Sequence, residues 1–136
     1  MTRIVLTALL VVSGLSWTIP PGAGSGFDRT TVLAAQGAVP ACDDRSVCAA
    51  LALEARAAGQ YETFHDLAWR AMQTGPSDDP ATMHLLARAQ ALSGRRRDAL
   101  VMLDRIAAMG VATGAESDED LQRVRELPGW PAVAAR

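Results

Sequence analysis

Two helical patterns, each ending at a glycine, recur along the chain at an offset of 35 residues. Gly59 aligns with Gly94, and Ala52 aligns with Ala87. The same offset aligns Phe64 with Ala99, Ala68 with Leu103, Ala71 with Ile106, and Gly75 with Gly110. A two-helix unit of this length cannot bury its own apolar face and is stabilised by stacking on a neighbour. The recurrence therefore predicts an all-α domain of two stacked antiparallel helical hairpins.

Start and stop signals give the bounds of the expected helices. Asp43 or Asp44 can cap the first helix, and Asp79-Pro80 places a capping carboxylate before a proline at the first helical position. Glycines then stop the helices, because they adopt the left-handed conformation that ends a helix. The expected helices cover residues 45–58, 60–74, 80–93 and 95–109. Aromatic content is only 4% against 49% hydrophobic residues, so the core must consist of Ala, Leu and Met.

A short C-terminal capping helix is expected after Gly110. Ser117 can cap it, and the acidic run Asp118–Asp120 suits the positive end of a helix. Its inward face carries Leu121, Val124 and Leu127. Trp130 and Val133 follow a Pro-Gly break and are expected to form a lid on the last hairpin, because a terminal repeat must cover its apolar face.

The N-terminus has the pattern of an export signal. Arg3 precedes the uncharged stretch Ile4–Ile19, which a Pro-Pro-Gly break ends. The stretch is shorter than the roughly 20 residues of a bilayer span, and an uncleaved anchor or a lipid on Cys42 are the alternatives. We therefore expect a signal peptide and low-complexity leader over residues 1–38, a helical domain over 42–136, and a periplasmic or secreted protein. Residues 20–41, rich in Gly, Pro and Ser, are expected to be disordered.

The only two cysteines, Cys42 and Cys48, are separated by five residues and lie just before and inside the first expected helix. In an oxidising compartment such a pair predicts a disulfide, with free buried thiols as the alternative. Their spacing to His65 and His84 matches no compact zinc pattern. No metal site is expected.

Residues 81–111, ATMHLLARAQALSGRRRDALVMLDRIAAMGV, resemble the tetratricopeptide repeat family. Ala87 stands where two helices of such a repeat cross closely, Gly94 lies at the turn, and Ala99 and Leu103 of the second helix pack back on the first. The first unit departs from the pattern, because Phe64 takes the place of the small residue. The resemblance covers residues 45–111, and a plain four-helix bundle is the alternative.

The resemblance implies a partner groove lined by the first helix of each hairpin. The residues placed in that groove are Leu53, Arg56, His84, Arg88 and Leu92. Arg56 and Arg88 would receive a carboxylate or an acidic peptide, because guanidinium groups bind carboxylates in a bidentate manner. Ordinary solvated charges are the alternative reading of the two arginines.

Residues 80–136 also resemble the helical leader that precedes some gluconolactonase-like β-propeller hydrolases. Propeller strands do not follow in this sequence, so no lactonase chemistry is carried over. The resemblance implies a helical module that once accompanied an enzyme, or that still serves an enzyme on another chain.

Catalytic patterns are missing from the sequence. It offers no nucleophile with a paired base and no glycine-rich phosphate loop in a strand–helix context, so we expect neither catalysis nor a cofactor. A net charge of −2, with Arg95–Arg97 as the one basic run, speaks against nucleic-acid binding. The sequence predicts an exported, non-catalytic module for protein–protein interaction in the cell envelope. The alternatives are an accessory or truncated leader of a gluconolactonase-like hydrolase, or a small-molecule carrier.

Overall fold

Four helices of 13 residues each dominate residues 39–136, the part of the chain that the computed structural model describes. They are α2 (Arg45–Ala57), α3 (Tyr61–Gln73), α4 (Pro80–Leu92) and α5 (Arg96–Ala108). No strand occurs in this range, as the sequence predicts, and none of its helices has the length and apolar character needed to span a membrane. The expected signal peptide and leader, residues 1–38, lie outside the described residues.

The helix ends follow the signals in the sequence to within one or two residues. Asp44, the second of the two candidate caps, accepts hydrogen bonds from the amides of Ser46 at 2.8 Å and Val47 at 3.1 Å. Asp79 caps α4 in the same way, and Pro80 is its first residue. Gly59 and Gly94 reverse the chain with φ of +71° and +85°, values that favour glycine because it has no Cβ.

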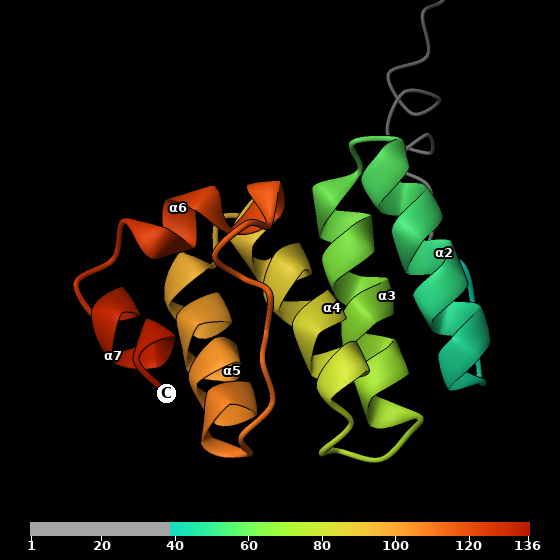
Figure 1. Ribbon diagram of the computed structural model, residues 1–136. Helices are drawn as coiled ribbons and strands as arrows, with labels where there is room; N and C mark the ends of the chain where they lie inside the picture. The colour runs from blue at the N-terminus through green and yellow to red at the C-terminus, as the bar shows by residue number, and fades with distance from the viewer. Residues whose placement is uncertain (1–38) are drawn as a thin grey trace, which may run out of the picture. The chain divides into compact units, whose positions relative to one another are not determined.

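Each helix packs chiefly on the next one along the chain: α2 on α3, α3 on α4, and α4 on α5. Neighbouring helices run antiparallel (Figure 1). The two hairpins start 35 residues apart, at Arg45 and Pro80. Ala52 and Ala87, the aligned alanines of the first helices, are both completely buried. Both hairpins therefore hold a small side chain in the core at the same point of their first helix.

Gly75 and Gly110 align at the 35-residue offset but differ in backbone conformation. Gly110 has a φ of +73°, whereas Gly75 is not among the glycines with positive φ. A Cβ on Gly75 would instead lie 2.4 Å from Cδ of Arg45, whose guanidinium pairs with Asp79 at 3.1 Å. Gly75 therefore makes room for a side chain of α2, while Gly110 serves the backbone turn after α5.

The single capping helix expected at the C-terminus is three short pieces: the 3-10 turn η1 (Glu119–Leu121), α6 (Gln122–Arg125) and α7 (Trp130–Ala134). Ser117 is not the cap. The carboxylate of Asp118 accepts the amide of Asp120 at 3.0 Å, so the first turn begins one residue later than predicted. α7 packs on α5, with Val133 buried and Trp130 partly buried, in the position of the expected lid.

A disulfide joins Cys42 to Cys48, with a Cα–Cα distance of 5.4 Å, and both side chains are buried. It ties the segment before α2 to the first turns of that helix. Arg70 of α3 also donates to the carbonyl of Pro40 at 3.3 Å. Residues 39–41, expected to belong to a disordered linker, are thus held against the first hairpin, and the rest of that linker lies outside the described residues.

Reducing the disulfide, or replacing both cysteines with alanine, is expected to lower the free energy of unfolding by about 2 kcal/mol, the value for closing so short a loop in the unfolded chain. Urea unfolding with and without dithiothreitol measures the difference. Identical midpoints would show that the bond does not stabilise the fold.

Candidate functional site

Two arginines from corresponding helices of the two hairpins bind one carboxylate. Arg56 of α2 donates to both oxygens of Asp120, from Nε at 2.6 Å and from Nη2 at 2.8 Å. Arg88 of α4 donates to Oδ2 of the same residue from Nε at 2.9 Å, and its Nη2 also lies 2.9 Å from that oxygen. We call Arg56, Arg88 and Asp120 the arginine clamp. It joins both hairpins to η1 by charge-assisted hydrogen bonds, which are stronger than neutral ones.

In the clamp, the positive charges of the arginines stabilise the charged form of Asp120, and Asp120 stabilises that of Arg56. The carboxylate of Asp120 is only 10% exposed, and burial by itself would raise its pKa. The hydrogen bonds from Arg56 and Arg88 outweigh burial and hold the pKa of Asp120 below its ordinary value. The hydrogen bond to Asp120 in turn raises the pKa of Arg56. Asp120 and Arg56 therefore stay charged at neutral pH.

Asp118 and His84 extend the clamp along α4. Oδ2 of Asp118 lies 3.3 Å from Nε of Arg88 and 3.8 Å from Nε2 of His84. The distance to His84 is too long for a hydrogen bond, and this buried nitrogen has no partner among residues 39–136. Burial lowers the pKa of His84, an effect that outweighs the opposing pull of Asp118. His84 is thus neutral at pH 7.

The low pKa of His84 predicts loss of stability in acid. Because the unfolded chain takes up this proton more readily, with an ordinary pKa of 6.5, stability is full above that pH and falls as the pH drops toward the folded pKa. Urea unfolding at about pH 7.5 and 5.5 should show the loss, and a His84→Gln variant should lose less over this interval. Equal pH dependence in the wild-type protein and the His84→Gln variant would contradict the assignment.

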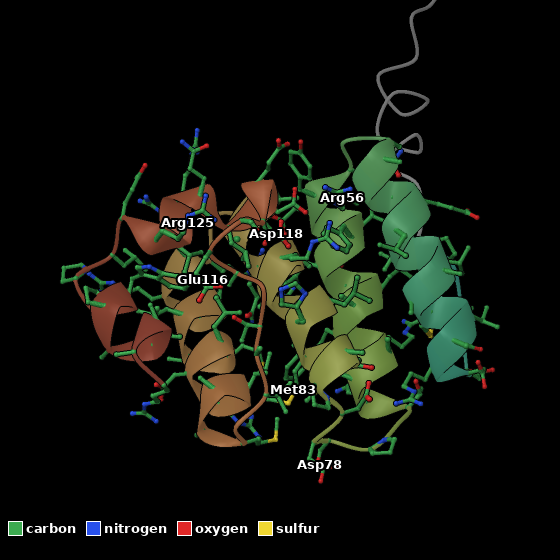
Figure 2. The ribbon with its side chains drawn as sticks, viewed as in Figure 1. Arg56, Asp78, Met83, Glu116, Asp118 and Arg125 are labelled. Atoms are coloured by element: carbon green, nitrogen blue, oxygen red, sulfur yellow. A yellow bond between two sulfur atoms is a disulfide. The ribbon has the colours of Figure 1, made fainter. Side chains whose placement is uncertain are left out.

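Residues 110–118, which we call the strap, carry the chain from the end of α5 to η1. The strap passes in front of α4 and α5 (Figure 1). Nη1 of Arg125 donates to the carbonyls of Ala115 at 2.8 Å and Asp118 at 2.7 Å, and Ala115 is completely buried. In Figure 2, Arg125 lies near the strap, and Asp118 lies between Arg125 and Arg56. The strap thereby positions Asp118 at its end, and Asp120 in the following turn η1, beside the first helices of the hairpins.

The five residues placed in the partner groove have different surroundings. Arg56, His84 and Arg88 lie together, but around carboxylates of the same chain. Leu92 lines a surface hollow of about 250 Å³ together with Tyr61 and residues of η1 and α6. Leu53, one turn before Arg56, is 46% exposed.

Sequence reasoning missed the role of Asp118 and Asp120, which it read as helix-capping residues. Asp118 does cap η1, but Asp120 binds the clamp. No pattern in the sequence marks this role, because Asp120 lies 64 residues from Arg56 and 32 from Arg88.

A metal site is not formed by the described part of the chain, where no three His, Cys, Asp or Glu side chains come together in a suitable group. Comparison with known proteins returns no significant match to any family model, curated protein or solved structure. Functional interpretation therefore rests on the geometry.

Proposed function

We propose that this chain is an exported, non-catalytic helical-repeat protein of tetratricopeptide-like build that mediates protein–protein interaction in the cell envelope. One observation carries the proposal: Arg56 and Arg88, on corresponding helices of the two hairpins, converge on a single carboxylate. Paired guanidinium groups recognise carboxylates with defined geometry. The face made by α2 and α4 is therefore suited to an acidic partner.

Apolar and aromatic groups flank the clamp on the same face. Leu53 stands exposed on α2, and Tyr61 and Leu92 border the hollow beside η1. Interfaces combine such exposed anchors with a few oriented polar contacts. The face thus offers apolar contact area next to a charge-selective site.

Export is supported by two features. The N-terminal sequence pattern favours it, and the Cys42–Cys48 disulfide fits an oxidising compartment, where such bonds persist.

Affinity capture of the exported protein, followed by mass spectrometry and by binding measurements with the purified partner, tests the proposal. Leu53→Glu should weaken binding by roughly tenfold or more, a loss typical of a charge placed in an interface. Val101→Glu is the matched control, because Val101 is 61% exposed but lies on α5, a second helix of a hairpin. Failure to recover a specific protein, or equal weakening by both variants, would count against the proposed face.

A further inference from the structure

The carboxylate that the clamp binds belongs to the protein itself. Asp120 fills both guanidinium groups, and Asp118 lies against Arg88 and His84. We infer that the chain's own Asp118–Leu121 segment closes the α2/α4 face in the free protein, and that a partner binds there by presenting an acidic segment of the same pattern. The inference rests on the proposed function, since it specifies the partner and the regulation of that face.

The closing segment defines the pattern a competitor must present. Two carboxylates stand two residues apart, at Asp118 and Asp120, and an apolar residue, Leu121, follows directly and is completely buried. Glu119 between them is exposed. A competing ligand therefore needs the order acid, any residue, acid, apolar residue. A single carboxylate would engage Arg56 and Arg88 without the contact to the Asp118 position or the apolar anchor.

The closing segment is connected on both sides to parts of the chain that can let it detach from α2 and α4. The strap contains Gly110 and Gly114, both at positive φ, and η1 and α6 have only three and four residues. Segments with little regular structure open at lower free energy than the helices they cover. Its contacts with α2 and α4 include the ion pairs of Asp118 and Asp120, and the side chain of Leu121 is buried. A ligand that carries the same charges and an apolar residue therefore replaces the contacts that it breaks.

Because Asp118 and Asp120 of the same chain already occupy the arginine site, the wild-type protein should bind a free acidic peptide weakly. A tethered ligand acts at an effective concentration in the millimolar range, so a free peptide competes poorly until the tethered carboxylates are removed. Without them, Arg56 and Arg88 would present two uncompensated positive charges, and the formal net charge of the chain would change from −2 to zero. The exposed positive charges favour acidic ligands over neutral ones.

The test uses a capped, fluorescent peptide of the chain's own sequence SDEDL, residues 117–121. An Asp118→Asn/Asp120→Asn variant should bind it at least tenfold more tightly than wild type, by fluorescence anisotropy at low salt. Adding Arg88→Gln to this variant should abolish the gain, and a peptide with asparagine in place of both aspartates should not bind. Absence of binding by the folded variant would overturn the inference.

Hydrogen exchange on the wild-type protein keeps the test decisive if the variant does not fold. Excess SDEDL peptide should accelerate amide exchange in residues 110–121 and leave α3 unchanged, whereas no acceleration would overturn the inference. The experiments distinguish failure of the proposed closure of the α2/α4 face from failure of the proposed interaction function. Peptide binding to the opened variant, with no protein captured by either form, would support closure and count against the proposed interaction function.

Discussion

Replacing Asp120 with alanine is expected to lower the free energy of unfolding by about 2–3 kcal/mol. Removing one member of a buried, hydrogen-bonded ion pair costs roughly 3–5 kcal/mol because it leaves the partner charge uncompensated. The figure is smaller here because the Arg56 side chain is 36% exposed and retains some contact with water. Two guanidinium groups would also be left facing each other, a like-charge contact that adds to the loss. Urea unfolding followed by circular dichroism measures the change.

Glu119→Ala is the control for this substitution. Glu119 lies in the same 3-10 turn and carries the same charge, but it is exposed. Substitutions at such positions change stability by about 0.5 kcal/mol or less. Equal effects of Asp120→Ala and Glu119→Ala would show that the clamp does not hold the turn in place.

Phe64→Ala is expected to cost about 3–5 kcal/mol, the range for truncating a buried phenylalanine. Phe64 is completely buried in the core between the helices, where Ala99 stands at the corresponding position of the second hairpin. The tetratricopeptide pattern would favour a small residue such as alanine at position 64. The packing predicts the opposite, because the neighbours of Phe64 fill the space around a large ring and would leave a cavity around alanine. Thermal and urea unfolding give the difference.

Trp69→Ala provides the comparison on the same helix. Its side chain is larger than that of Phe64 but 46% exposed, so its truncation removes less buried area and is expected to cost roughly 1 kcal/mol. If Phe64→Ala were no more damaging than Trp69→Ala, position 64 would tolerate a small residue and the two hairpins would pack alike.

The helices and their packing order were predictable because their signals are local and repeated. Asp44 and Asp79 precede helical patterns as capping residues do, and Gly59 and Gly94 follow the ends of first helices. Ala52 and Ala87 recur at the 35-residue offset, and both are completely buried. The repeat thus encodes the core of each hairpin.

The contents of the candidate site were not predictable in the same way. Arg56 and Asp120 are 64 residues apart, and a single ion pair between distant positions leaves no periodic trace in the sequence. Considered only with its neighbours in the sequence, the acidic run Asp118–Asp120 has the pattern of helix-capping residues. Gly75 illustrates the same limit, because the residue that requires it to lack a side chain, Arg45, lies on another helix. The resemblance to the tetratricopeptide repeat predicts one face for Arg56, His84 and Arg88, whereas the carboxylates beside them lie outside residues 45–111.

Closure of the α2/α4 face is tested most directly by a double-mutant cycle between Arg56 and Asp120. The free energies of unfolding of wild type, Arg56→Gln, Asp120→Asn and the double variant give the coupling between the two side chains. Contact through two hydrogen bonds predicts a coupling of about 1–2 kcal/mol. A coupling below about 0.3 kcal/mol, the limit for independent sites, would contradict closure by this carboxylate.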